Sequence, residues 1–356
     1  MANTPDLDSL RNYTNVADER LGALALFASD DFFAAKERML HPGEPQWREG
    51  VYDAHGKWMD GWESRRRRDQ GHDYCVVKLG AAAKLAALDI DTRYFTGNYP
   101  PFASVEACRI EENPDAGTKW SVLLPQVSVA GNQRNLFPLQ SDQVWTHLKL
   151  NIFPDGGVAR FRAYGTVQYD WSRAAASASG GMDLVAALHG GRAIACSDEH
   201  YGSMHNVLLP GRGASMADGW ETRRRREPGY DWVILQLGTP GRIQYIEIDT
   251  AHFKGNFPHQ VSIQGTALQG AEQAHVVSQS LYWPVLLEPQ LLRADSEHRF
   301  QAELRDPGGP VSHVRVNIHP DGGLSRVRLF GAAAGAAELA HGSAGLPRGP
   351  AGSARR

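Results

Sequence analysis

Apolar positions along the chain fall into short runs separated by glycine, proline and polar residues, with little helical periodicity. Residues 73–79 and 231–237 are apolar-rich runs that end at a glycine, which predicts buried strands. In residues 147–152 polar and apolar side chains alternate, so the leucines and the isoleucine share one strand face. The Pro-Asp-Gly-Gly sequence that follows predicts a tight turn and a hairpin that returns through residues 160–164. The pattern is typical of an all-β protein built as a β-sandwich.

The same order of motifs occurs twice. The sequence DGWESRRRR at residues 60–68 returns as DGWETRRRR at residues 218–226, an offset of 218 − 60 = 158. The block His-x-Lys/Arg-x-Asn-Ile-x-Pro-Asp-Gly-Gly occurs at residues 147–157 and again at residues 313–323, an offset of 313 − 147 = 166. The second copy therefore carries eight additional residues between its two blocks, because 166 − 158 = 8. Two long copies indicate a tandem duplicated domain rather than a solenoid.

The duplication and the local composition define the domain organisation. We expect a first β-sandwich repeat over residues 1–175 and a second over residues 183–331, joined by the segment rich in Ala, Ser and Gly at residues 174–181. Residues 332–356 are rich in Ala, Gly, Ser and Pro and have no apolar period, which predicts a disordered tail.

Composition narrows the class of protein and its location. The 356 residues include 37 basic and 40 acidic side chains, so the net charge is -3, and there is no broad basic excess for binding nucleic acid or an anionic membrane. The apolar runs are too short to cross a bilayer, and the first residues lack the basic and apolar regions of a signal peptide. Three widely spaced cysteines favour a reducing compartment over a disulfide framework. We therefore expect a cytoplasmic protein.

The repeated arginine run is the most informative motif. In an extended segment Arg65 and Arg67 point one way while Arg66 and Arg68 point the other, so one pair could line a pocket while the other binds carboxylates. The planar fork of arginine suits a bound carboxylate or ureido group. A solvated or ion-paired strand edge is the alternative interpretation. The candidate substrate-binding residues are Arg65, Arg67, Arg223, Arg225, Asn98 and Asn256.

The candidate asparagines lie in Phe-x-Gly-Asn-aromatic-Pro loops at residues 95–100 and 253–258, where the amide could hold a ligand or only shape a tight turn.

Several common catalytic motifs do not occur. The sequence contains no glycine-rich phosphate loop, no GxSxG, no HExxH and no CxxC. This argues against the common nucleotide-binding, serine-hydrolase and zincin mechanisms.

Repeated carboxylates and histidines supply candidate acid–base groups. Glu63 and Glu221, each directly before the Ser/Thr that opens the arginine run, are candidate general bases, or else structural ion-pair partners of arginine. His147 and His313 are the histidines that both repeats share, and each lies on the same strand face as a basic residue and an asparagine. They are candidate catalytic residues, or else part of a polar outer sheet face.

Together the GWE(S/T)RRRR motif, the Ile-Asp-Thr-x-x-Phe-x-Gly-Asn-aromatic-Pro block and the histidine block resemble the allantoicase family over about residues 15–331. The resemblance implies a tandem duplicated jelly-roll β-sandwich, similar to galactose-binding-like domains. It also implies a homo-oligomeric hydrolase that converts allantoate to ureidoglycolate and urea in allantoin and purine degradation. No ligand spacing in the sequence demonstrates a metal site, and a divalent cation stays open as a cofactor.

The two repeats are not identical, and other functions remain to be separated. Residues 295–300 of the second repeat (DSEHRF) stand where the first has GNQRN, and the segment before the arginine motif is longer in the first repeat. The active site could therefore be present in only one of the two repeats. A lectin-like protein that binds small ligands or carbohydrates is the alternative, and so is an assembly module in which arginine–carboxylate pairs join subunits.

Overall fold

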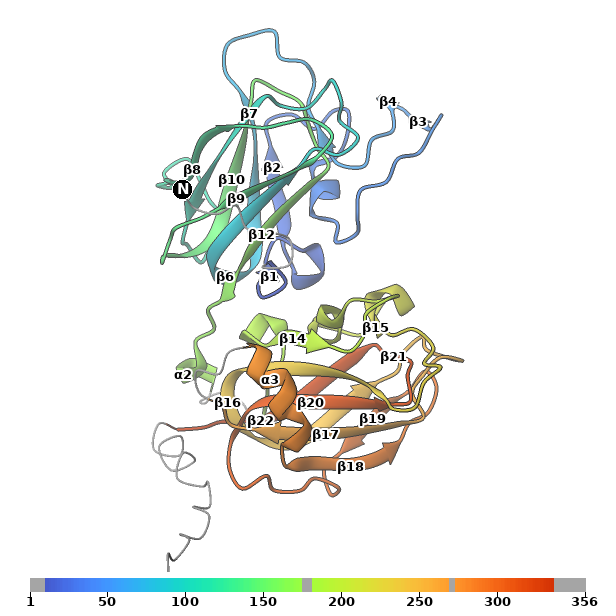
Figure 1. Cartoon of the computed structure of the whole chain (residues 1–356). Helices are drawn as coiled ribbons and strands as arrows, with labels where there is room; N and C mark the ends of the chain where they lie inside the picture. Colours follow the sequence, from blue (N-terminus) through green and yellow to red (C-terminus); the bar gives the residue numbers. More distant parts are fainter. Residues whose placement is uncertain (1–9, 175–180, 269–272, 336–356) are drawn as a thin grey trace, which may run out of the picture. The chain divides into compact units, whose positions relative to one another are not determined.

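The computed structural model describes residues 10–174, 181–268 and 273–335, and nearly all of their regular structure is β-strand (Figure 1). The chain divides into two compact units, one formed mainly by residues up to Asp170 and the other mainly by residues from Trp171 onward. Each unit holds one repeat, so the predicted all-β, tandem duplicated jelly-roll sandwich is confirmed. The last strand continues to Ala333, and residues 336–356 of the predicted tail lie outside the described residues.

The first repeat consists of short strands around one long central strand, with brief 3₁₀ helices (labelled η) between them. Its elements are β1 (Thr14–Asn15), η1 (Glu19–Leu21), β2 (Leu24–Ala28), η2 (Lys36–Leu40), β3 (Tyr52–Asp53), β4 (Gly56–Lys57), β5 (Trp62–Glu63), β6 (Asp73–Asp91), β7 (Phe102–Cys108), β8 (Ser121–Ser128), β9 (Arg134–Pro138), β10 (Val144–Phe153), β11 (Gly157–Val158) and β12 (Arg160–Val167).

The second repeat follows the short helix α2 (Trp171–Ala174) and has the same plan. Its elements are β13 (Met182–Asp183), η3 (Ala187–His189), β14 (Arg192–Cys196), η4 (Met204–Leu208), η5 (Met216–Asp218), β15 (Trp220–Glu221), β16 (Asp231–Asp249), β17 (Gln260–Thr266), α3 (Gln273–Gln279), η6 (Ser280–Tyr282), β18 (Val285–Leu291), β19 (Glu297–Phe300), β20 (Val311–His319), β21 (Gly323–Leu324) and β22 (Arg326–Ala333).

One long strand serves both layers of each sandwich. The first half of β6 pairs with β2 and β10, and its second half pairs with β9 and β12. The sequence prediction that this strand ends at Gly80 is wrong. A Cβ atom at Gly80 would lie 2.5 Å from the carbonyl oxygen of Leu21, so the glycine permits a close backbone approach inside the strand. In the second repeat β16 likewise pairs with β20 through its first half and with β22 through its second.

The predicted hairpin between residues 147–152 and 160–164 is also wrong. Strands β10 and β12 both pair with β6 rather than with each other, so the Pro-Asp-Gly-Gly segment connects the two layers of the sandwich. Tertiary contacts direct this turn, because the Gly157 N–H donates to the carbonyl of Asn98 at 2.7 Å and β11 pairs with β5. The turn therefore brings Asp155 beside the arginine motif instead of closing a local hairpin.

The predicted apolar face of β10 is confirmed, although His147 and Asn151 of its polar face are buried too. Leu148, Leu150 and Ile152 are fully buried and belong to the central core, together with Trp62 and Phe161. The core thus contains both the alternating strand and the tryptophan of the repeated motif. Burial of Trp62 fixes the short strand β5, which positions the glutamate and the arginines that follow it.

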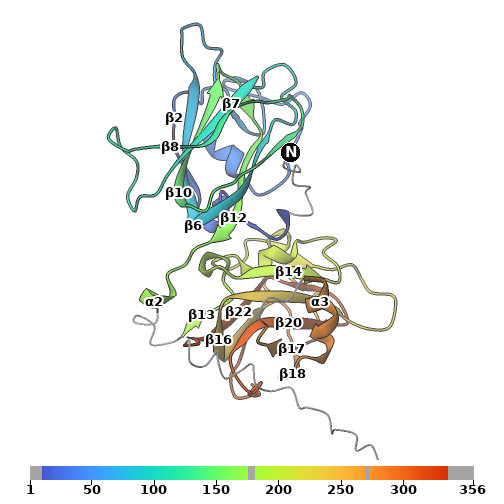
Figure 2. The same cartoon turned by 60° about the vertical axis from the view of Figure 1, so that its left-hand side comes forward.

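Insertions give the two repeats different surfaces. The additional residues of the second repeat include α3 and η6, and α3 lies over the β17–β20 part of the sheet (Figure 2). There Val276 and Trp283 pack against Ile234 of β16. In the first repeat the longer segment before the arginine motif forms β3 and β4, where the second repeat has η5. The segments before the two arginine motifs therefore differ in structure as well as in length.

Candidate active site

The arginine run of the first repeat alternates between paired and unpaired side chains. Arg65 donates to Asp30 through its backbone N–H at 2.9 Å and through its guanidinium at 2.7 Å. The backbone N–H of Arg67 donates to Asp155 at 2.8 Å, and its Nη1 donates to the buried Asp73 at 2.7 Å. The amides on both sides of Arg66 are thus fixed by aspartates, which directs the Arg66 side chain away from them.

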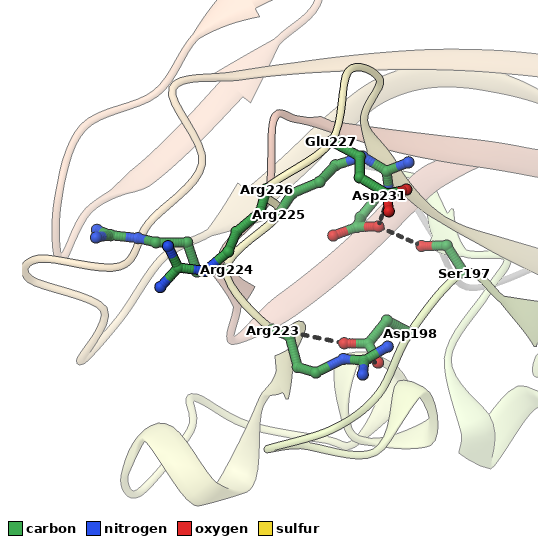
Figure 3. A pocket seen from close by; sticks show the side chains of 8 residues that line it. All are labelled: Ser197, Asp198, Arg223, Arg224, Arg225, Arg226, Glu227 and Asp231. Carbon is green, nitrogen blue, oxygen red and sulfur yellow. Dashed lines mark hydrogen bonds and ion pairs between the residues drawn. The ribbon is translucent and has the colours of Figure 1, made fainter.

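The second repeat reproduces this arrangement. The backbone N–H groups of Arg223 and Arg225 donate to Asp198 at 2.6 Å and to Asp321 at 2.8 Å. The guanidinium of Arg225 donates to Asp231 at 2.9 Å. Figure 3 shows Arg223 beside Asp198. The four arginines predicted as substrate ligands are therefore the members of the run that bind aspartates.

Sequence reasoning missed the side chains between these arginines. Within the described ranges, no hydrogen bond or ion pair engages the guanidinium of Arg66, which lines a pocket. The alternation was predicted, but nothing in the run itself identified which pair would find carboxylates. A further repeated signal existed: Asp30 and Asp198 both follow a serine, Ser29 and Ser197. Those two Ser-Asp pairs supply the carboxylates that bind the first arginine of each run.

Glu63 and Asn98 form the centre of this pocket. The Asn98 amide donates to Glu63 Oε1 at 2.6 Å, which joins two of the predicted site residues. Glu63 is half-buried, and burial raises the pKa of its carboxyl group, while the hydrogen bond from Asn98 acts in the opposite direction. A carboxyl group with a raised pKa in a pocket is a candidate for proton transfer.

The pocket has a volume of about 670 Å³ and combines charged, amide and aromatic groups. Its lining includes Glu63, Arg66, Asn98, Phe33, Tyr99 and Asp155. A volume of this size fits a small metabolite, and a carboxylate, an amide and a guanidinium can together recognise a polar anion. Throughout the described part of the chain, no group of three or more His, Cys, Asp or Glu side chains is arranged to hold a metal ion.

The matching pair in the second repeat has different surroundings. Asn256 donates to Glu221, as Asn98 does to Glu63, but its amide also lies 3.8 Å from the sulfur of Met216 in η5. The pocket found beside the second arginine run does not include Glu221 or Asn256 in its lining. The shorter connection before the second motif therefore places a methionine beside the glutamate–asparagine pair.

The predicted histidines lie far from these pairs. His147 is six residues before Phe153 at the opposite end of β10, which is about 20 Å away at about 3.3 Å per residue. Its ring is buried, Nδ1 lies 2.9 Å from the Thr146 hydroxyl, and burial together with Lys78 lowers its pKa. His313 occupies the same position in β20 and lies 2.8 Å from the hydroxyl of Ser312. The structure does not bring either histidine together with Glu63 or Glu221.

The sequence difference between the repeats near residue 298 has a structural origin. His298 is paired with Ile248, and Asn135 is paired with Ile90 at the same place in the first repeat. His298 Nδ1 lies 3.2 Å from the carbonyl of Ile248, and its Nε2 accepts from the Arg293 N–H at 2.8 Å. The Asn135 amide donates to Ile90 at 3.0 Å and accepts from a neighbouring backbone N–H. Each side chain therefore stabilises the loop before its strand through hydrogen bonds to backbone groups.

Replacement of His298 tests this equivalence. We expect His298→Ala to lower the free energy of unfolding by about 1–2 kcal/mol, because it leaves the Arg293 N–H and the Ile248 carbonyl without these contacts. His298→Asn should recover most of that loss, since Asn135 makes both kinds of contact in the first repeat. Urea unfolding of the two variants measures the difference. Equal destabilisation by both would contradict the equivalence.

No helix within the described ranges is long and apolar enough to cross a membrane. None of the three cysteines forms a disulfide: Cys75 and Cys108 are buried, and Cys196 is partly exposed.

Comparison with known proteins gives a consistent result. A family model described as "Allantoicase repeat" matches residues 14–168 and 182–334. A protein named "Probable allantoicase" from Pseudomonas aeruginosa is 52% identical over 322 residues, which is 90% of this chain and 96% of the relative. Another of that name, from Photobacterium profundum, is 52% identical over 91% of this chain and 97% of its own length. The crystal structure of allantoicase from Saccharomyces cerevisiae has a TM-score of 0.75 and 36% identity, covering 90% of this chain and 94% of that one.

Proposed function

The chain belongs to the allantoicase family, and we propose that it hydrolyses allantoate in the first-repeat pocket formed by Glu63, Asn98 and Arg66. The activity expected from the sequence, conversion of allantoate to ureidoglycolate and urea, agrees with relatives named allantoicase that cover nearly the whole chain. Nothing in these relatives favours a lectin-like binding protein over the enzyme. The observation that carries the location is the hydrogen-bonded Glu63–Asn98 pair inside an open pocket.

The reaction sets three chemical requirements. Allantoate carries one carboxylate and two ureido groups on a single carbon atom. Hydrolysis breaks the bond between that carbon and one ureido nitrogen, and a new bond forms from the carbon to the oxygen of water. The water must lose a proton and the departing nitrogen must gain one, because urea leaves as a neutral molecule. The pocket must also bind the carboxylate and orient the ureido groups.

Glu63 is suited to both proton transfers. As a carboxylate it accepts a proton from water, and as a carboxylic acid it returns that proton to the departing nitrogen. Its raised pKa supports the second step because it favours the protonated form of the carboxyl group. Asn98 holds Glu63 Oε1 with its amide N–H, and its own carbonyl oxygen can accept a hydrogen bond from a ureido N–H group.

Arg66 is suited to the substrate carboxylate. Its guanidinium lines the pocket, while its neighbours Arg65 and Arg67 are held by Asp30 and Asp73. A planar guanidinium can bind a carboxylate through two parallel hydrogen bonds, which fixes the orientation of the substrate. The sequence-based assignment of substrate binding to Arg65 and Arg67 is therefore revised in this proposal to the arginine between them.

The pH profile of urea release tests the proposal. A base must be deprotonated to act, so kcat/KM should rise with pH through a pKa above the ordinary range of glutamate. Asn98→Ala removes the hydrogen bond that lowers the pKa of Glu63, so the midpoint of the rise should move to higher pH. Urea released from allantoate is measured across pH, with and without a chelator to address the open question of a metal. A pH midpoint of kcat/KM that does not move in Asn98→Ala would contradict the assignment of Glu63 as the base. No urea release at any pH would contradict the proposed hydrolysis of allantoate.

The cellular setting is also a proposal. We infer that the enzyme works in the cytoplasm as a homo-oligomer and does not bind nucleic acid. Three cysteines that form no disulfide support the location, and a net charge of -3 supports the absence of nucleic-acid binding. The family resemblance supports the assembly.

A further inference from the structure

The third arginine of each run is Arg67 in the first repeat and Arg225 in the second. The two differ in what lies against the guanidinium edge formed by Nε and Nη2. In the first repeat, Nη1 of Arg67 binds Asp73, and the other edge faces Asp69. Nε of Arg67 lies 3.2 Å from Asp69 Oδ1 in an ion pair that is not aligned as a hydrogen bond, and its Nη2 donates to Asp69 Oδ2 at 3.3 Å. A carboxylate of the chain itself therefore faces the fork of this guanidinium with both of its oxygens.

In the second repeat no carboxylate of the described residues pairs with the same edge. Arg225 binds Asp231 through Nη1 as Arg67 binds Asp73, but its Nε is buried and has no hydrogen-bond partner. Glu227 replaces Asp69, and among the described residues it forms no hydrogen bond or ion pair. Arg225 and Glu227 both line a pocket of about 320 Å³, shown in Figure 3. The buried donor is thus left unpaired at the wall of a pocket.

The charges around this pocket favour an anion. Arg223 and Arg225 each pair with an aspartate, Asp198 and Asp231. Arg224 and Arg226 also line the pocket, and no described residue pairs with either guanidinium. In Figure 3 the Arg224 side chain extends away from both aspartates. The pocket lining thus holds four guanidinium groups and three carboxylates, an excess of one positive charge, around a volume at the small end of metabolite pockets.

We propose that the second repeat binds a small carboxylate at the free edge of Arg225, in the position that Asp69 holds in the first repeat. The carboxylate accepts from Nε and Nη2 of Arg225, and the excess of positive charge in the pocket lining favours an anion. The site shares no residue with the pocket in which hydrolysis is proposed. Allantoate and ureidoglycolate both carry a carboxylate, so the ligand belongs either to the reaction or to the wider pool of small carboxylic acids.

Direct binding to the full-length chain tests the proposal, with succinate as a probe that is not hydrolysed. The parent chain should bind one more equivalent of carboxylate than Glu227→Asp, which restores the side chain that fills the edge in the first repeat. Arg225→Lys should show the same loss, at least about tenfold in affinity, because lysine can keep the charge beside Asp231 but offers no fork. Isothermal titration gives stoichiometry and affinity together.

A second titration uses allantoate with the Glu63→Gln chain. Loss of one allantoate equivalent when Glu227→Asp is added to that chain, without loss of a succinate equivalent, assigns the site to the reaction. Loss of one equivalent of each probe assigns it to small carboxylates in general. Stoichiometry that Glu227→Asp and Arg225→Lys both leave unchanged would overturn the proposal. Loss of urea release in Glu227→Asp would also overturn it, because the pocket would then be the site of hydrolysis. The succinate result does not depend on Glu63, so a failure of the proposed catalytic site is distinguishable.

Discussion

Glu63→Gln should lower kcat for allantoate hydrolysis about 10²- to 10⁴-fold, the usual contribution of a positioned general acid–base. Glutamine can still accept the hydrogen bond that Asn98 donates to Oε1, so the pocket should keep its shape. It cannot take a proton from water or return one to the departing nitrogen. KM should change much less than kcat, because the carboxylate of the substrate is bound elsewhere in the pocket.

Duplication supplies the matched control for this variant. Glu221 has the same place in the motif and the same asparagine partner, but Met216 lies beside that pair. Glu221→Gln should therefore keep kcat within a few-fold of the parent, a small effect beside that of a catalytic group. Urea release under saturating allantoate compares the two variants. A larger loss in Glu221→Gln than in Glu63→Gln would place hydrolysis in the second repeat.

Strand faces and the duplication could be predicted because they depend on local patterns. Leu148, Leu150 and Ile152 are buried as their alternation predicts, and both repeats fold alike because they carry the same motifs. The extent of β6 could not be predicted, since the glycine that resembled a strand end is explained by a backbone contact with Leu21. The prediction of a local hairpin at the Pro-Asp-Gly-Gly turn was wrong for a related reason. The direction of this turn depends on a hydrogen bond to Asn98 and on the pairing of β11 with β5, and these partners are distant in sequence.

The candidate site was predicted in part for similar reasons. Glu63 and Asn98 could be named from repeated motifs, and the structure places them in contact. The histidines also occur in both repeats, but the position of a residue along its strand decides which end of the sheet it reaches. His147 lies six residues before Phe153, the end of β10 nearest the pocket. The choice between Arg65 and Arg66 depended on Asp30 and Asp155, which come from other parts of the chain. Repetition identifies candidate residues, whereas distant carboxylates decide which remain free to bind a ligand.

Arg66→Ala should lower kcat/KM for allantoate about 100-fold. Two charge-assisted hydrogen bonds to the carboxylate contribute about 1.5 kcal/mol or more each, and each 1.4 kcal/mol corresponds to about tenfold. Most of the loss should be seen as a higher KM, because the carboxylate is bound in the ground state and in the transition state alike. Arg66→Lys should retain part of the affinity through its charge while losing the paired geometry.

Arg68→Ala is the matched control for Arg66→Ala, because Arg68 is an exposed arginine of the same run that does not line the pocket. Its KM should stay near that of the parent, whereas Arg65→Ala and Arg67→Ala should act mainly by releasing Asp30 and Asp73 and so by lowering stability. Steady-state kinetics and thermal unfolding of the four variants separate these effects. A KM for Arg66→Ala equal to that of Arg68→Ala would mean that the substrate carboxylate is bound elsewhere. The hydrogen bonds that the backbone N–H groups on either side of Arg66 donate to Asp30 and Asp155 would then serve only to stabilise the loop.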